Sequence, residues 1–184
     1  MNALIVCSDG FEEIETLAVA DILRRGQVDV TIATLESSPR PLIGARTVRL
    51  LPDATLTDCA NTPFDALILP GGWQNALNLA ASPLLAQILS QRAQNNQLIA
   101  AICASPAIVL GACGLPGTNR RATCYPGLED RLQAIPTEAD VVEDANYITS
   151  RGPATAIPFA LAILSRLAGK EIAAHIASDL LFRN

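Results

Sequence analysis

The chain has almost no histidine, no long apolar run and no block of basic residues. His175 is the single histidine in 184 residues, which rules out a metal site built from several histidines of one chain. The apolar runs are far shorter than the roughly 20 residues that cross a bilayer. The formal net charge is −5, and no cluster of Lys or Arg offers a surface for a phosphate backbone. We therefore expect neither a membrane segment nor nucleic acid as a stable partner.

The chain also lacks a basic segment ahead of its first apolar run, Ala3 to Val6, which follows Met1-Asn2 directly. An acidic stretch comes soon after it, and this order is unlike a secretory signal. We therefore expect a cytoplasmic protein.

The cysteines form no recognisable framework. Five cannot all pair, and none has the Cys-x-x-Cys spacing of a usual zinc site, so we expect free thiols. These residues are Cys7, Cys59, Cys103, Cys113 and Cys124. For all except Cys103 we expect a packing role, because a free cysteine most often acts as a small buried hydrophobe.

Apolar strand-like runs alternate with amphipathic segments along the chain. This alternation predicts one α/β domain over residues 1–184, a three-layer α/β/α sandwich with a mainly parallel sheet. The expected strands are residues 3–7, 28–35, 66–69, 98–102, 122–125, 141–143 and 147–150, with a partly exposed or edge strand over 46–50. The expected helices are residues 12–25, 83–95, 153–167 and 170–181, the first with an apolar stripe of Ile14, Leu17, Ala18 and Ile22.

Cys103 is the leading candidate for a reactive residue. It follows the buried strand 98–102 and precedes Ser105-Pro106, which reads as a helix start with Ser as N-cap. A cysteine at a helix N-terminus faces unpaired N–H groups and the positive end of the helix dipole, which favour the thiolate. Ligands of open parallel sheets bind at this same edge, outside the carboxyl ends of the strands.

Glu15 is the acid that we expect beside Cys103. Glu12, Glu13 and Glu15 could simply form a solvated acidic first turn. A glutamate one turn into the helix can instead lean back over the strand edge. Burial beside a sulfur would raise its pKa and leave a carboxyl that can pass protons.

Two further residues have weaker cases. Gly72, after the strand 66–69, can bring a backbone N–H close to a reacting oxygen, although a plain turn explains Gly71-Gly72 equally well. His175 lies on the last helix, and we expect a surface residue rather than a catalytic base.

Four segments in register resemble the ThiJ/PfpI superfamily, and most closely its DJ-1 branch in a bacterial form. They cover nearly the whole chain in the right order, and together they are specific although each is modest alone. These segments are Glu12-Glu13-Ile14-Glu15-Thr16, Leu69-Pro70-Gly71-Gly72, Ala100-Ala101-Ile102-Cys103-Ala104 and Thr149-Ser150-Arg151-Gly152-Pro153.

The resemblance implies a flavodoxin-like fold, a homodimer, a nucleophilic and oxidation-sensitive Cys103, and a protonated Glu15. It also implies an oxyanion pocket formed by the backbone N–H groups of Gly72 and Ala104. Further residues would line the site, some of them near the dimer interface: Ser150, Arg151, Gly152 and Pro153.

One position departs from that family pattern. Many members carry a histidine before a proline near the cysteine, where this chain has Tyr125-Pro126. A Cys-His pair is therefore absent there, which weakens hydrolytic mechanisms that need an imidazole base. We count Tyr125 among the pocket residues.

The expected activity is the glutathione-independent glyoxalase reaction attributed to the family, in which methylglyoxal becomes lactate without metal or organic cofactor. A related expectation is deglycation, the removal of methylglyoxal or glyoxal adducts from proteins and nucleotides. The alternative is a non-enzymatic oxidative-stress sensor or redox-regulated chaperone that works through oxidation of Cys103. A receiver domain is disfavoured because Leu69-Pro70 stands where its phosphoacceptor Asp belongs. A flavin-binding protein is also disfavoured, because the first loop carries acidic residues where a flavin phosphate needs hydrogen-bond donors.

Overall fold

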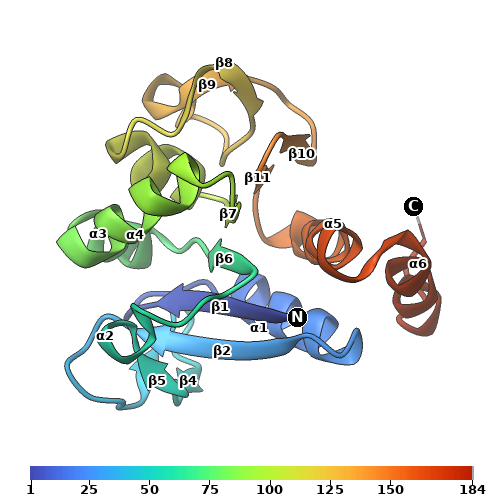
Figure 1. Ribbon diagram of the computed structural model, residues 1–184, viewed down its shortest axis with the longest axis horizontal. Helices are drawn as coiled ribbons and strands as arrows, with labels where there is room; N and C mark the ends of the chain where they lie inside the picture. Colours follow the sequence, from blue (N-terminus) through green and yellow to red (C-terminus); the bar gives the residue numbers. More distant parts are fainter. Residues whose placement is uncertain (184) are drawn as a thin grey trace.

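A seven-stranded sheet forms the centre of the computed structural model, which describes residues 1–183 (Figure 1). The strand order is β10-β11-β7-β6-β1-β2-β5, and every neighbouring pair is parallel except β10 and β11. The predicted mainly parallel α/β fold is confirmed. The strands are β1 (Asn2–Cys7), β2 (Asp29–Thr34), β5 (Ala54–Thr55), β6 (Ala66–Leu69), β7 (Leu98–Ile102), β10 (Val141–Asp144) and β11 (Tyr147–Ser150).

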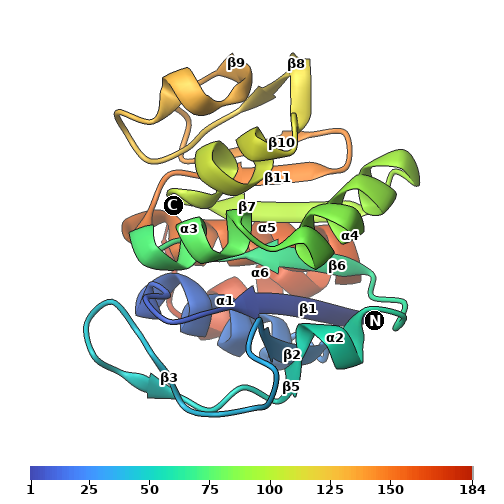
Figure 2. The same ribbon diagram turned by 90° about the vertical axis from the view of Figure 1, so that its left-hand side faces the viewer.

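Helices cover both faces of this sheet (Figure 2). One layer holds α1 (Glu13–Arg25), α5 (Ala156–Ala168) and α6 (Lys170–Asp179). The other holds α2 (Leu56–Cys59), α3 (Trp73–Ala80), α4 (Pro83–Gln94) and a π-helical segment, Pro106–Leu110. Short 3₁₀ turns lie at Glu129–Arg131 and Pro153–Thr155. No helix within residues 1–183 is long and apolar enough to cross a membrane.

The central strands are buried on both faces. Every residue of β6 and β7 is buried, as expected for parallel strands that lie between two helical layers. Side chains of Ile5, Ile68 and Ile102 are almost completely removed from water. Burial of each such side chain stabilises the fold by about 1.5–3 kcal/mol.

Two small accessory sheets correct the sequence expectations. The expected strand over 46–50 is only β4 (Arg49–Leu50), which pairs with β3 (Leu42–Ile43) in a separate hairpin. The strand expected over 122–125 lies earlier in the chain: β8 spans Pro116–Ala122, so only Ala122 of the expected range belongs to it. Strand β8 pairs in parallel with β9 (Gln133–Pro136). Residues 123–125, which include Tyr125, instead lie in the loop after β8.

The apolar stripe predicted on α1 is partly wrong. Ile22 is buried, but Ile14 is 56% exposed and Leu17 is 41% exposed. The buried face instead contains Glu15, Thr16, Val19, Ala20 and Leu23. Apolar periodicity alone cannot tell a face that packs inside the subunit from one that is left for another surface.

Candidate functional site

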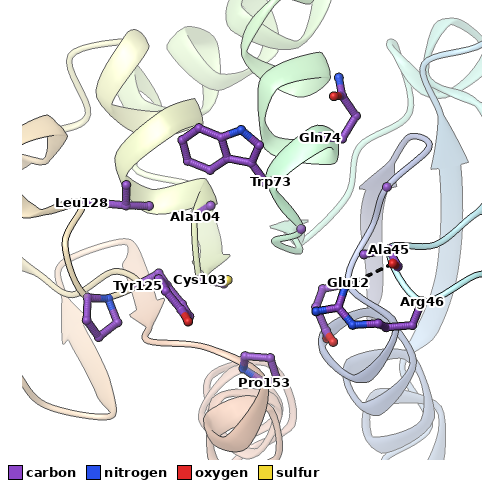
Figure 3. Close-up of a pocket in the computed structure, with 13 residues that line it drawn as sticks. Glu12, Ala45, Arg46, Trp73, Gln74, Cys103, Ala104, Tyr125, Leu128 and Pro153 are labelled. Carbon is purple, nitrogen blue, oxygen red and sulfur yellow. Dashed lines mark hydrogen bonds between the residues drawn. The ribbon is translucent and has the colours of Figure 1, made fainter.

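The carboxyl ends of β1, β6 and β7 meet at one edge of the sheet, and the loops that follow them form the site (Figure 3). The loop after β1 leads to Glu12 and α1, the loop after β6 contains Gly71-Gly72, and β7 ends directly at Cys103. The structure thus brings together residues far apart in the sequence, as the parallel order predicts.

Cys103 occupies a strained turn. Its φ is +65°, a left-handed conformation that costs a non-glycine residue roughly 1–3 kcal/mol. Two hydrogen bonds hold the turn: the Cys103 N–H donates to the Ser150 carbonyl at 2.9 Å, and the Tyr125 N–H donates to the Cys103 carbonyl at 2.8 Å. The side chain is buried, with its sulfur at the edge of the cleft described below.

The helix after Cys103 starts where the sequence predicts, with Ser105 at the N-cap position and Pro106 directly after it. The Ser105 side chain, however, makes no hydrogen bond to the helix N-terminus. Its hydroxyl donates instead to the Pro70 carbonyl at 2.6 Å. This bond links the turn after β7 to the turn after β6, and so it fixes the positions of Cys103 and Gly71 relative to each other.

Glu15 is fully buried, which excludes a solvated acidic turn at this residue. Its Oε2 accepts a hydrogen bond from the Gly71 N–H at 2.7 Å. Its Oε1 is buried without a hydrogen-bond partner among residues 1–183. Burial raises the pKa of Glu15 to about 7, so the carboxyl is protonated in a large fraction of molecules near neutral pH.

The neighbouring acids have structural roles. Glu12 is the N-cap of α1, and its carboxylate accepts from the Glu15 N–H at 2.8 Å. Glu13 is buried and accepts from the Arg46 N–H at 2.5 Å, which ties the β3–β4 hairpin to the start of α1. Only Glu15 among the three therefore has an oxygen free beside the cysteine.

The turn at Cys103 does not by itself favour the thiolate. Burial raises the pKa of Cys103 to about 12, and the nearby Glu15 charge adds to the rise. The backbone N–H groups of Gly72 and Ala104 lower the pKa, but by less. The expectation that Cys103 is a thiolate is thus wrong, because the loss of hydration raises its pKa more than the N–H groups near the helix N-terminus lower it. The thiol needs a base to take its proton, and Glu15 is the group beside it.

Gly71 was missed as a site residue. A Cβ at this position would stand 2.5 Å from Cys103 Cβ and 2.6 Å from Glu15 Oε2. Only glycine therefore lets the carboxyl and the sulfur approach each other here. At Gly72, φ is +88° and a Cβ would collide with the backbone carbonyl of Gly10. The Gly71-Gly72 pair is the only sign in the sequence that these residues belong to the site, and a plain turn explains this pair equally well.

A cleft of about 650 Å³ opens above Cys103. In Figure 3, Trp73 and Leu128 lie on one side of the sulfur, Tyr125 and Pro153 lie below it, and Glu12 and Arg46 face them from across the cleft. The lining residues are Gly10, Glu12, Ala45, Arg46, Gly72, Trp73, Gln74, Cys103, Ala104, Tyr125, Pro126, Leu128 and Pro153.

Arg46 reaches the cleft through contacts that sequence reasoning did not find. Arg40 pairs with Asp9 at 2.7 Å, and the Ile43 N–H donates to Asp9 at 2.9 Å. The hydrogen bonds from Arg40 and from the Ile43 N–H both lower the pKa of Asp9. The hairpin is thereby held over the loop after β1, and Arg46 comes to line the cleft.

The residues carried over from the family resemblance lie around the cleft but not all in its lining. Tyr125 and Pro153 line it, and Gly152 lies against the Tyr125 ring, where a Cβ would be 3.4 Å from Cδ2. Arg151 does not line it, because its guanidinium donates to the Glu138 carbonyl at 2.9 Å. Ser150 donates to the Asp140 carbonyl at 2.7 Å.

The remaining cysteines lie outside the cleft lining. Cys7 is fully buried, 4.0 Å from the Thr16 hydroxyl, and burial raises its pKa to about 12. Cys59 lies on α2, and burial also raises the pKa values of Cys59, Cys113 and Cys124.

His175 is exposed on α6 near Asp179, as predicted. Within residues 1–183, no three His, Cys, Asp or Glu side chains come together as metal ligands.

The fold and the site together define a class: an α/β sandwich with a cysteine on a strained strand-to-helix turn, a buried glutamate beside it and two backbone N–H groups aimed at the sulfur. Residues 1–166 match the model of the DJ-1/PfpI family, and the chain belongs to this family.

Similar proteins match most or all of the chain. The Parkinson disease protein 7 homolog of Danio rerio is 37% identical over 188 residues, covering 100% of this chain and 98% of that protein. The crystal structure of Drosophila melanogaster DJ-1beta has a TM-score of 0.95 at 38% identity, covering 100% of this chain and 98% of that one. The glutathione-independent glyoxalase DJR-1.2 of Caenorhabditis elegans is 37% identical, covering 87% of this chain and 84% of that protein. The DJ-1 branch is therefore confirmed.

Proposed function

We propose that the chain is a glutathione-independent glyoxalase that converts small 2-oxoaldehydes, such as methylglyoxal, to 2-hydroxy acids. The observation that carries this proposal is the buried Glu15, which has one unpartnered oxygen and a pKa of about 7 beside the Cys103 thiol. Such a carboxyl can accept and return protons at neutral pH. The name of the Caenorhabditis elegans relative agrees with this chemistry.

In the first step, the Cys103 sulfur adds to the aldehyde carbon of methylglyoxal while Glu15 takes the thiol proton. A C–S bond forms, and the aldehyde C=O becomes an alkoxide held by the N–H groups of Gly72 and Ala104. The same two N–H groups hydrogen-bond to the Cys103 sulfur, so they lie within reach of an oxygen on the carbon that becomes bonded to this sulfur. The proton then returns from Glu15 to the alkoxide, which gives a hemithioacetal.

In the second step, the Glu15 carboxylate removes the hydrogen from the former aldehyde carbon and returns it to the adjacent carbon through an enediol. The hydroxyl proton passes at the same time from the first oxygen to the second. The product is a lactoyl thioester on Cys103, and water cleaves it to lactate and the free thiol. The overall reaction adds one water to methylglyoxal, with no net oxidation and no cofactor.

The experiment is an assay of the purified chain with methylglyoxal in the absence of glutathione. We expect one lactate for each methylglyoxal consumed, measured by NMR. Loss of methylglyoxal without lactate would mean simple scavenging by thiols and arginines, and it would contradict the proposal.

Deglycation would use the same site to attack adducts of methylglyoxal. It is hard to separate from action on the free aldehyde, because methylglyoxal equilibrates with its adducts. A preformed adduct on a small thiol separates the two. If the adduct disappears no faster than it dissociates spontaneously, the chain acts on the free aldehyde. Faster loss would establish direct attack on the adduct.

Oxidation sensing would use the same sulfur. The thiolate is the form that peroxide attacks, so the raised pKa of Cys103 gives this alternative less support. Intact mass measured after mild peroxide tests it. A selective gain of two oxygens at Cys103 would favour the sensor, and random oxidation across the cysteines would exclude it.

We also propose that the chain works as a homodimer. Four exposed apolar side chains, called the α1 patch here, lie on α1 and on the hairpin tied to its start: Ile14, Leu17, Ile43 and Val48. A second copy would remove this apolar surface from water, and surfaces of this kind commonly mark an interaction site.

A further inference from the structure

The cleft is much larger than methylglyoxal. At about 30 Å³ for each non-hydrogen atom, the share of a water molecule in the liquid, methylglyoxal takes only about 150 Å³. The cleft measures about 650 Å³. Most of it therefore lies beyond the atoms that react at Cys103, and this remaining space is suited to a substituent on the substrate.

Aromatic side chains are few in this chain, and two of them line this space. The sequence holds four Phe, two Tyr and one Trp. Two of these side chains are about half exposed to water, Trp73 at 52% and Tyr125 at 49%, and both line the cleft. The other five are more buried: Phe11, Phe64, Phe159 and Tyr147 are buried, and Phe182 is partly buried. Exposure of the large rings is thus concentrated at the cleft.

Both rings are attached to rigid parts of the site. Trp73 is the first residue of α3, directly after Gly72, whose carbonyl accepts the Ala76 N–H at 2.9 Å. Tyr125 donates its N–H to the Cys103 carbonyl, and one edge of its ring rests on Gly152. Figure 3 shows the two rings on different sides of the space beside the sulfur. Together with Leu128 they form what we call the apolar wall of the cleft. Polar side chains, Glu12 and Arg46, face this wall.

We infer that the substrates preferred by this chain are 2-oxoaldehydes whose ketone carbon carries a planar aromatic group. This inference rests on the proposed glyoxalase function and deepens it. The aldehyde carbon reaches Cys103, and the ring lies against Trp73 and Tyr125 in the apolar half of the cleft. Aromatic rings attract one another in stacked and edge-to-face arrangements beyond the effect of burial. Such a substrate, with ten non-hydrogen atoms for phenylglyoxal, takes about 300 Å³ and fits the cleft.

The first test compares kcat/KM for phenylglyoxal with that for methylglyoxal. We expect the wild type to favour phenylglyoxal at least about tenfold, which equals about 1.4 kcal/mol. Trp73→Ala and Tyr125→Ala should each remove most of this ratio. Leu77→Ala is the matched control, because Leu77 lies one turn along α3 and does not line the cleft. Cys103→Ser, measured in parallel, subtracts the direct reaction of phenylglyoxal with arginine side chains.

The second test does not depend on catalysis. Trp73 is the only tryptophan of the chain, so tryptophan fluorescence reports on this wall of the cleft alone. In Cys103→Ser we expect mandelate, the product from phenylglyoxal, to quench this fluorescence saturably, while lactate at equal concentration does not. Tyr125→Ala should weaken mandelate binding about tenfold.

The outcomes separate the two proposals. Turnover of methylglyoxal with equal or lower kcat/KM for phenylglyoxal, and no difference between mandelate and lactate, overturns the aromatic preference and leaves the glyoxalase function standing. No turnover of either aldehyde removes the glyoxalase function, and the mandelate titration then decides whether the cleft binds aromatic ligands.

Discussion

The backbone N–H of Gly71 donates a 2.7 Å hydrogen bond to Oε2 of Glu15 and thereby fixes the carboxyl beside Cys103. The same glycine leaves the gap that the sulfur and the carboxyl share, because any Cβ there would stand 2.5 Å from Cys103 Cβ. One residue thus determines both the distance between the acid and the nucleophile and the hydrogen bond that orients the acid.

Gly71→Ala should therefore damage the site and the fold together. Forcing a methyl group into a packed core typically costs 1–3 kcal/mol. We expect a lower urea midpoint and a loss of kcat/KM for methylglyoxal of about 100-fold, since the acid and the sulfur must separate.

Gly114→Ala is the matched control for this variant. An added Cβ there meets open space, but the φ of +69° makes alanine unfavourable by roughly 1–2 kcal/mol. This variant should lose stability and keep its activity. Equal activity in the two alanine variants would show that Gly71 has no special place in the site.

Glu15 should make the protein less stable as pH rises. Its pKa is about 7 in the folded state against an ordinary value of 4.5, so the folded state holds its proton more tightly. The stabilisation is fully present below pH 4.5 and is lost as pH rises through about 7, and it amounts to about 3 kcal/mol. Urea unfolding between pH 4.5 and 8 measures this contribution as the difference in free energy of unfolding between wild type and Glu15→Gln. A difference that stays constant with pH would mean that Glu15 is an ordinary carboxyl.

The pH dependence of catalysis should follow the same carboxyl. Glu15 must be ionised to take the proton of Cys103, so kcat/KM for methylglyoxal should rise through an apparent pKa of about 7. The thiol pKa of about 12 predicts a flat profile from there to about pH 9. A fall in kcat/KM above pH 7 would instead assign the protonated carboxyl to the attacking step.

The α1 patch predicts a variant that changes assembly. Ile14→Glu or Leu17→Glu places charge on the exposed apolar face of α1 and should weaken a dimer at least about tenfold, because burial of an unpaired charge is costly. Sedimentation equilibrium measures the change. Ile172→Glu on α6 is the control, since Ile172 is similarly exposed at 43% and lies outside the patch. A wild type that sediments as a monomer at high concentration would remove the homodimer proposal.

The main sheet and the pair at its edge could be predicted because the signals are local. Strands β6 and β7 are continuous apolar runs that end at Gly71-Gly72 and Cys103, and parallel strands bring such ends together. The buried side of α1 could not be predicted in the same way. Ile14 and Leu17 read as core in a periodic pattern, while the helix buries Glu15 toward Cys103.

The walls of the cleft depend on contacts between distant residues, which no local pattern reveals. Arg46 is placed by the hairpin that Asp9 holds through Arg40, a contact across 31 residues of sequence. The thiol pKa is also a property of the assembled site, since the degree of burial at Cys103 outweighs the helix end that is visible in the sequence. Ser105 shows the same limit, because its hydroxyl reaches Pro70 instead of capping its own helix.

The most direct test of the central claim is methylglyoxal consumption by wild type, Cys103→Ser and Glu15→Gln, with thermal unfolding measured on each to confirm that the variants are folded. We predict that both substitutions lower kcat/KM by at least about 100-fold, since each removes a group that forms a bond or moves a proton in the reaction. Equal consumption by wild type and Cys103→Ser would contradict the account.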